Sequence, residues 1–179
     1  MVADTAISFE LTVPSAAEMS QRVETLLATY PWLVAVDNGD LAGYAYGSPH
    51  RSRAAYGWST DVSVYVDPQA QRQGVGRALY AALLDVLRRQ RFEQAFAGIA
   101  LPNPASVGLH EAMGFSAIGV YRNVGWKLGR WHDVGWWQRS LGSFNGMPQE
   151  PRPMSELDAA EVGEALEQAT AHLHSPRRG

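Results

Sequence analysis

The segment from Val64 to Arg77 constrains the fold of this chain more than any other feature. A β-branched run passes through the spacing Gln71-x-x-Gly74-x-Gly76 into a long amphipathic stretch. Glycine lets the backbone take positive φ angles and approach a ligand closely, and the first N–H groups of a helix have no partner within it. A strand, a glycine turn and a helix N-terminus in this order can hold a pyrophosphate. The alternative is that the glycines only tighten a strand-to-helix turn.

The amphipathic stretch predicts a helix that extends to about residue 90. Its apolar residues recur at the i, i+3, i+4, i+7 spacing of a core-facing stripe: Val75, Ala78, Leu79, Ala82, Leu83, Val86 and Leu87. The turn before it has neither the G-x-G-x-x-G spacing of a dinucleotide-binding fold nor the Gly-Lys-Ser/Thr of a P-loop. The turn therefore gives only weak support to a dinucleotide site or a P-loop.

Further elements alternate between strand and helix patterns, which indicates an α/β protein. Asp37-Asn38-Gly39-Asp40 is typical of a tight hairpin turn, and Asn103 followed by Pro104 is typical of a helix start. Gly114 fits the end of that helix. The expected helices cover residues 15–29, 75–90 and 103–113, and the expected strands cover residues 33–36, 41–46, 58–66, 96–100, 117–122 and 133–139.

Composition narrows the function classes. The chain has 179 residues, is 46% hydrophobic and carries a net charge of −3, which suits one compact domain and argues against bulk nucleic-acid binding. It has no cysteine, and its five histidines lack metal-ligand spacing, so we expect no metal. An apolar run near 20 residues and a secretory signal are both absent from the sequence. We therefore expect a cytoplasmic protein without a membrane span.

A change in composition near residue 142 predicts a boundary. We expect one folded domain over residues 1–142 and a proline-containing linker with a C-terminal tail or helix over residues 143–179. Pro148, Pro151 and Pro153 mark the linker. Residues 155–173 have a weak amphipathic pattern, which we interpret as an appendage or a partly disordered tail.

The glycine turn and six further blocks resemble the GNAT acyltransferases, in which the turn holds the pyrophosphate of acetyl-coenzyme A. The blocks look like those of the phosphinothricin and methionine sulfoximine N-acetyltransferases, and they extend from about residue 5 to 141. They are Tyr30-Pro31-Trp32-Leu33-Val34-Ala35, Pro49-His50-Arg51-Ser52-Arg53, Val64-Tyr65-Val66, Leu101-Pro102-Asn103, Leu109-His110-Glu111-Ala112-Met113-Gly114-Phe115 and Gly129-Arg130-Trp131-His132-Asp133-Val134-Gly135.

The resemblance implies a fold and a reaction. It implies a GNAT fold with a mixed, mostly antiparallel sheet flanked by helices, acetyl-CoA as co-substrate, an amino-acid-like amine as acceptor, and a homodimer. Relative to the family, the first strand and most of the first helix are missing from this sequence. Either the start is truncated, or the C-terminal helix or a partner subunit fills the gap, because an uncovered sheet edge promotes association.

The resemblance also implies which residues bind the cofactor. Backbone groups of the strand before the turn would bind the thioester and the pantetheine arm, and the turn with its arginines would bind the phosphates. Asn103 and Ser106 would cap their helix and contact the arm as well. The predicted cofactor-binding residues are Val64, Tyr65, Val66, Gln71, Arg72, Gln73, Gly74, Val75, Gly76, Arg77, Asn103 and Ser106.

Two residues are candidates for proton transfer. Asp61 stands where the family has a glutamate base, and its side chain is shorter by one C–C bond, about 1.5 Å. A bridging water could restore the contact, and the alternative is an ordinary polar residue at a strand edge. His110 stands where many GNAT enzymes have a tyrosine that protonates the leaving thiolate, a role that histidine can fill near neutral pH. The alternative is a histidine that only packs or forms hydrogen bonds.

The acceptor side is less constrained. His50, Arg51 and Ser52 match the family's substrate loop, and an arginine there could hold a carboxylate bidentately. Trp131 and His132 match a late loop of the same pocket. A polyamine or a protein N-terminus remains an alternative acceptor, and a non-catalytic acyl-CoA-binding module remains an alternative function.

Overall fold

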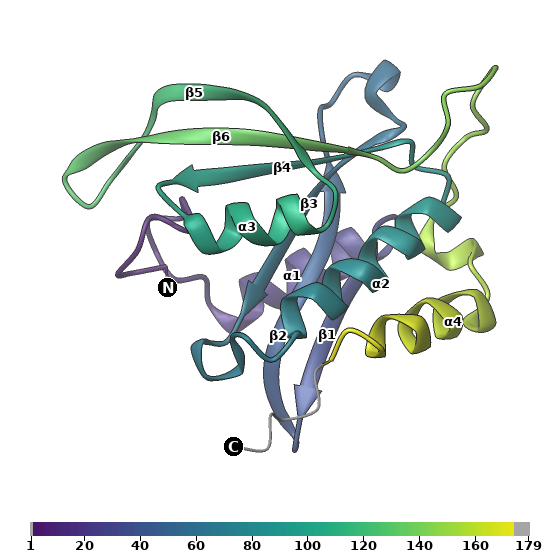
Figure 1. Ribbon diagram of the computed structural model, residues 1–179, viewed down its shortest axis with the longest axis horizontal. Coiled ribbons are helices and arrows are strands. Elements are labelled where there is room, and N and C mark those ends of the chain that lie inside the picture. The colour runs from purple at the N-terminus through teal and green to yellow at the C-terminus, as the bar shows by residue number, and fades with distance from the viewer. Residues whose placement is uncertain (1, 174–179) are drawn as a thin grey trace.

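The computed structural model describes residues 2–173, which form a six-stranded sheet and four α-helices. The strand order is β1-β2-β3-β4-β6-β5, and every neighbouring pair is antiparallel except β3 and β4 (Figure 1). This mixed sheet confirms the predicted fold class. The elements are α1 (Ala16–Leu27), β1 (Trp32–Asp37), β2 (Asp40–Pro49), β3 (Ser59–Val66), α2 (Val75–Arg89), β4 (Gln94–Leu101), α3 (Pro104–Ala112), β5 (Ser116–Lys127), β6 (Arg130–Ser140) and α4 (Ala159–Thr170).

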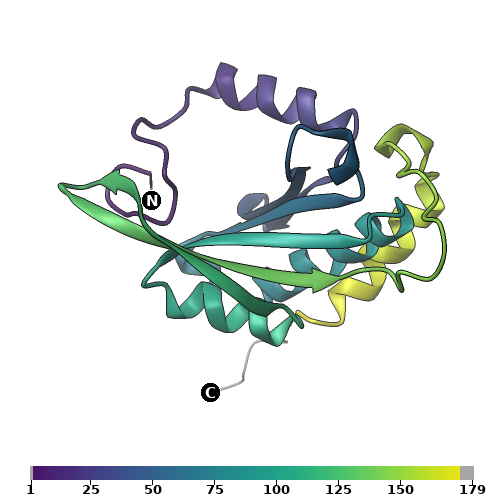
Figure 2. The same cartoon turned by 90° about the horizontal axis from the view of Figure 1, so that it is seen from above.

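Helices cover the two faces of the sheet unequally. Figure 2 shows α2, α3 and α4 on one face, and α1 with the N-terminal segment on the other. The core lies under α2, whose apolar stripe packs on the strands: Leu79, Leu83 and Leu87 contact a cluster that includes Ala45 and Val62. In contrast, α1 has no buried residue. The predicted stripe of α2 therefore anchors the fold.

The predicted caps and turns form as expected. Ser15 and Glu18 make a reciprocal capping box at the start of α1. Asn103 caps α3, with Pro104 in its first turn, and Gly114 follows the helix with a φ of +81°. Asn38 takes a φ of +51° in the hairpin between β1 and β2. The sequence chemistry of these turns thus fixes the ends of the elements that carry the site.

The sheet opens between its two parallel strands. Pairing between β3 and β4 is limited to Ser59–Asp61 with residues 94–96, although β3 continues to Val66 and β4 to Leu101. Pairing ends at Asp61, and Figure 1 shows the two strands diverging. Backbone groups on the facing edges of this fork are therefore free of ladder hydrogen bonds between the two strands.

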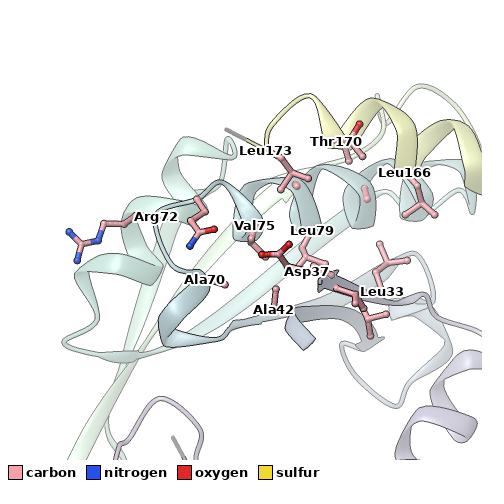
Figure 3. A pocket seen from close by; sticks show the side chains of 17 residues that line it. Leu33, Asp37, Ala42, Ala70, Arg72, Val75, Leu79, Leu166, Thr170 and Leu173 are labelled. Atoms are coloured by element: carbon pink, nitrogen blue, oxygen red, sulfur yellow. The ribbon is translucent and has the colours of Figure 1, made fainter. Parts of the chain in front are cut away.

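Strand β1 forms the other edge of the sheet. Within residues 2–173 it pairs only with β2, and its side chains Val34 and Val36 are exposed. The C-terminal helix packs on α2 through Val86, Leu157 and Ala165. A cavity of about 1090 Å³ remains between α4, α2 and β1 (Figure 3). Helix α4 thus lies beside α2 and faces β1 across this cavity, and whether it fills the gap left by the missing elements stays a prediction.

The segment after residue 142 is joined to the domain by hydrogen bonds. Arg152 N donates to the carbonyl of Gln90, and the Gln90 side-chain amide donates to the carbonyls of Arg152 and Thr29. Helix α4 begins at Asp158, which forms a second capping box with Glu161. The predicted tail residues 174–179 lie outside the described residues, and the division at residue 142 stays a prediction. No helix among residues 2–173 is long and apolar enough to cross a membrane.

Candidate active site

The turn before α2 forms a cradle of backbone N–H groups. Gly74 is the N-cap residue with a φ of +88°, and Arg72 has a φ of +62°. No side chain caps the helix, and its first turn holds no acidic residue. A Cβ on Gly76 would lie 3.2 Å from Leu109 Cδ2 and 3.3 Å from Val66 Cγ2, so the glycine keeps α2 close to α3 and β3. This geometry suits an anion at the helix N-terminus.

The polar side chains of the turn lie at the surface. Gln71, Arg72, Gln73 and Arg77 are exposed, whereas Val75 is buried in the core. Any contribution of Val75 to a cofactor would therefore come from its backbone N–H. The arginines can reach phosphate groups from outside the cradle.

The fork between β3 and β4 begins at Asp61, and the predicted cofactor strand lines its β3 side. Val64, Tyr65 and Val66 pair with β2 on their other side, so β3 is held in place while its inner edge stays open. Free donors on a rigid strand can bind an oxyanion and an amide. The structure thus brings the cradle, the open strand and Asp61 onto one continuous path, and their cofactor contacts stay a prediction.

Asn103 and Ser106 organise α3. Asn103 Oδ1 accepts a hydrogen bond from Ser106 N at 3.1 Å. The carbonyl of Ser106 in turn lies 2.7 Å from His110 Nδ1. Both residues therefore have structural tasks that coexist with the predicted contact to the cofactor.

His110 is buried, with both ring nitrogens in hydrogen bonds. Tyr80 Oη lies 2.7 Å from Nε2, and the Ser106 carbonyl accepts from Nδ1. The ring also meets Phe115 edge-on at 5.3 Å. Burial lowers the pKa of His110, which favours the neutral imidazole. A proton could leave this ring only by exchange with one of these partners, and its predicted role as the acid stays a prediction.

Asp61 pairs with His50 across β2 and β3. His50 Nδ1 lies 2.6 Å from Asp61 Oδ1, and 10% and 28% of the two side chains are exposed. The imidazole stacks on Phe96 at 4.1 Å. Burial raises the pKa of Asp61 above its ordinary value, and the hydrogen bond and charge of His50 and the charge of Arg51 oppose this rise. The two predicted residues thus form one unit, which the sequence did not indicate.

A cavity of about 350 Å³ opens within the fork, beyond Asp61. Segments far apart in the sequence enclose it: the N-terminal segment, β3, β4, β5 and β6. Trp136 joins this cavity to the pair, because its ring lies edge-on 6.2 Å from His50. The lining residues are Ile7, Ser8, Phe9, Tyr65, Gly98, Ala100, Tyr121, Val124, Val134 and Trp136.

The predicted substrate residues divide into two groups. Arg51 lies with its guanidinium 5.8 Å from the Trp136 ring, beside the cavity, and Ser52 is exposed in the same loop. Trp131 is 57% exposed and packs against Trp126 on the β5–β6 hairpin. His132 is buried, and its Nε2 donates to the carbonyl of Lys127. The structure therefore brings His50 and Arg51 against Trp136, one wall of the cavity, while Trp131 lies on the outer surface.

Sequence reasoning missed several residues that shape the cavity. Lys127 is buried and donates to the carbonyls of Val2 and Ser8, which holds the N-terminal segment against the hairpin (Figure 2). Phe9, the residue after Ser8 in this segment, lines the cavity. The available signal in the sequence was a lysine within a strand, because a lysine that becomes buried there needs polar partners from another segment. Residues 2–173 contain no group of three or more His, Asp or Glu side chains that could hold a metal ion.

Comparisons with known proteins agree with this architecture. The family model of the acetyltransferase (GNAT) domain matches residues 2–136, and the chain belongs to this family. It is 43% identical over 148 residues to a phosphinothricin N-acetyltransferase of Streptomyces viridochromogenes, covering 83% of this chain and 79% of that protein. A phosphinothricin N-acetyltransferase of Streptomyces coelicolor is 46% identical over 105 residues, 59% of this chain and 61% of that protein.

A solved structure resembles the whole domain. It is the phosphinothricin acetyltransferase of Sinorhizobium meliloti in complex with acetyl-CoA. The TM-score is 0.80 at 37% identity, and the match covers 86% of this chain and 85% of that one. The fold and the order of the elements are thus those of the GNAT acetyltransferases.

Proposed function

We propose that this chain is an acetyl-CoA-dependent N-acetyltransferase that acts on a small amino-acid-like amine such as phosphinothricin or methionine sulfoximine. One observation carries the proposal: a carboxylate, Asp61, lies where β3 and β4 part, between an anion cradle and a cavity. Trp136, a wall of this cavity, contacts two predicted substrate residues, His50 and Arg51. The relatives named above support the acceptor class, since all three are named phosphinothricin acetyltransferases.

The donor lies along the fork in this proposal. Backbone N–H groups of residues 72–77 bind the pyrophosphate, with Arg72 and Arg77 as charged partners. The pantetheine arm hydrogen-bonds the free edge of Val64–Val66, as an added strand would. Its thioester then lies next to Asp61, and donors on the strand stabilise the oxyanion of the tetrahedral intermediate.

The chemistry needs a base more than an acid. An amine is mostly ammonium at neutral pH, so a proton must leave before the nitrogen attacks. We assign this proton to a base centred on Asp61. A thiol has a pKa of about 8.5, so the CoA thiolate leaves with little help. We propose that His110 stabilises α3 by its contacts to Tyr80 and Ser106 and acts on the site through them.

The acceptor occupies the cavity of the fork. Arg51 lies beside Trp136 at its rim and can bind the carboxylate of an amino-acid substrate bidentately. Aromatic side chains of Tyr65, Tyr121 and Trp136 contact the carbon chain. A pocket with one cation and several rings selects short, negatively charged amines over polyamines.

The direct test is CoA release over a panel of amines. Because the chain has no cysteine, a thiol reagent reports only free CoA. We expect turnover with phosphinothricin, methionine sulfoximine or methionine sulfone, and none with spermidine or an N-terminal peptide. If only spermidine or only the peptide is acetylated, the acceptor is not an amino-acid-like amine, and the proposal is wrong on this point. If the chain binds acetyl-CoA saturably but acetylates no amine, it is an acyl-CoA-binding module and not an enzyme.

We further propose that the chain forms a homodimer in the cytoplasm. Large apolar side chains are exposed along β5, β6 and their turn, which is typical of a docking surface: Ile118, Val120, Tyr121, Val124, Trp126, Leu128 and Trp131. Sedimentation of the wild-type chain against Trp126→Ser tests the dimer, and a monomeric wild type would contradict it. Cell fractionation tests the cytoplasmic location. The use of acetyl-CoA as a substrate supports this location.

A further inference from the structure

We infer that His50, oriented by Asp61, is the group that takes the proton from the acceptor ammonium. This inference rests on the proposed function, in which a base centred on Asp61 removes the proton. It assigns separate roles to Asp61 and His50 within that base. Asp61 fixes the ring and stabilises its positive charge, while the far nitrogen of His50 meets the substrate.

The contacts of the ring set its orientation. Nδ1 lies 2.6 Å from Asp61 Oδ1, which makes Nδ1 the donor to the carboxylate and leaves Nε2 as the acceptor. Within residues 2–173, Nδ1 is the ring nitrogen that has a hydrogen-bond partner, and Nε2 has none. This is the arrangement that a basic histidine needs.

Aromatic side chains hold the His50 ring in place and leave its nitrogens available for proton transfer. Phe96 stacks on one face of the imidazole with an interplanar angle of 12°. Trp136 and Tyr56 meet the ring edge-on at 6.2 and 6.0 Å. Trp136 also lines the cavity of the fork, so the imidazole contacts the carboxylate through Nδ1 and a wall of the cavity through its ring. The aspartate therefore acts at a distance through the imidazole.

The comparison with His110 makes the assignment specific. His110 has partners on both nitrogens, whereas His50 has one on Nδ1. The partner of His50 is a carboxylate, which stabilises an imidazolium, and the partners of His110 are a hydroxyl and a carbonyl. His50 can take a proton on a nitrogen that has no partner within residues 2–173, whereas a proton on His110 Nε2 requires the Tyr80 hydroxyl to change from donor to acceptor.

The proton balance closes. The substrate ammonium gives one proton to His50 Nε2, and its nitrogen then forms a bond to the thioester carbon. The carbon–sulfur bond breaks, and the thiolate takes the second proton that the nitrogen loses as the amide forms. His50 returns its proton to solvent, so one proton is released for each acetyl group transferred.

The test separates a basic His50 from a structural one. The amide of His50→Asn can still donate to Asp61, and the ring of His50→Phe can still stack on Phe96, but neither residue can take a proton. We expect kcat to fall by about 100-fold or more in both variants, with KM for acetyl-CoA unchanged. Imidazole added to His50→Ala should restore part of the rate. Tyr56→Phe, a neighbour of the same ring, is the matched control and should keep the wild-type kcat.

A second measurement does not depend on turnover. Nitrogen NMR of the imidazole, assigned by difference with His50→Asn, should find the proton on Nδ1 and a bare Nε2 in the free protein. A wild-type chain that acetylates no amine would reject the proposed function and leave this measurement valid. Full kcat in His50→Asn, or a proton on Nε2 in the free protein, would overturn the inference.

Discussion

Two histidines in this molecule, His50 and His110, have opposite environments. His110 is fully surrounded in the core, and both of its nitrogens are used by Tyr80 and Ser106. His50 keeps part of its surface exposed, pairs with the carboxylate of Asp61 through Nδ1, and has no hydrogen-bond partner for Nε2 within residues 2–173. A histidine can move a proton where one ring nitrogen has no partner and the other is held by a carboxylate, and it only stabilises the fold where both nitrogens are held by neutral groups.

The largest expected effect comes from Asp61→Asn. The amide still accepts a hydrogen bond from His50 but cannot stabilise an imidazolium, so we expect kcat to fall by about 100- to 10,000-fold. Acetyl-CoA binding, measured by calorimetry, should stay at the wild-type level because the cradle is untouched. Wild-type kcat in Asp61→Asn would mean that neither Asp61 nor His50 takes part in proton transfer. His50 would then be a structural residue like His110.

The same variant should not weaken the fold. Burial raises the pKa of Asp61 in the folded state, so ionising this carboxyl costs folding free energy, and its contribution to stability falls as the pH rises through the folded value. Asp61→Asn therefore unfolds at an equal or higher temperature than the wild type at neutral pH. Scanning calorimetry of the two proteins measures this, and a clear drop in Tm would mean that the pair stabilises the fold.

His110→Ala should have the reverse profile. It removes a buried ring from between Tyr80 and Phe115 and leaves the Tyr80 hydroxyl unpaired, which costs about 2–4 kcal/mol of unfolding free energy. Urea unfolding measures the loss, with the exposed neighbour Glu111→Ala as control. We expect the folded fraction to keep most of its kcat. A 100-fold lower kcat in properly folded protein would instead support the acid role for His110.

The pH dependence of stability sharpens the contrast further. Burial lowers the pKa of His110 in the folded state, so the unfolded chain binds a proton more readily. The contribution of His110 therefore falls as the pH decreases through its unfolded value, and it is complete above that value. Unfolding free energies measured between neutral and mildly acidic pH should decline less in His110→Gln than in the wild type. Parallel curves would assign the acid sensitivity to other groups.

Sequence and structure differ in what they can reveal about these two sites. Local chemistry predicted the capped helices, the hairpin at Asn38 and the stripe of α2, because each depends on residues close together in the chain. The resemblance indicated His50 and Asp61 separately, but their pairing depends on the register of β2 and β3, in which Ser48 faces Asp61. The burial of His110 by Tyr80, 30 positions away, depends likewise on how α2 and α3 pack.

Cavity walls are the hardest features to predict, for the same reason. Phe9 reaches the fork because Lys127 holds the N-terminal segment through Val2 and Ser8, a contact that spans most of the domain. Trp131, by contrast, matched a substrate loop but lies exposed against Trp126. A pattern of residue types places a side chain on a strand, and only the assembled sheet decides which surface that side chain joins.

The last variant, Tyr80→Phe, removes one of the two hydrogen-bond partners of His110 and should have the weakest effect. Tyr80→Phe removes one hydroxyl and leaves Nε2 of His110 buried without its donor, at a cost of about 1–2 kcal/mol, the order of one unmade buried hydrogen bond. The ring packing of Tyr80 on Phe115 remains. We expect a modest drop in the urea midpoint and no change in kcat, because freeing a nitrogen in a closed core gives no substrate access to it. A change in the pH profile of kcat in Tyr80→Phe would mean that the two histidines communicate, and that exposure alone does not separate them.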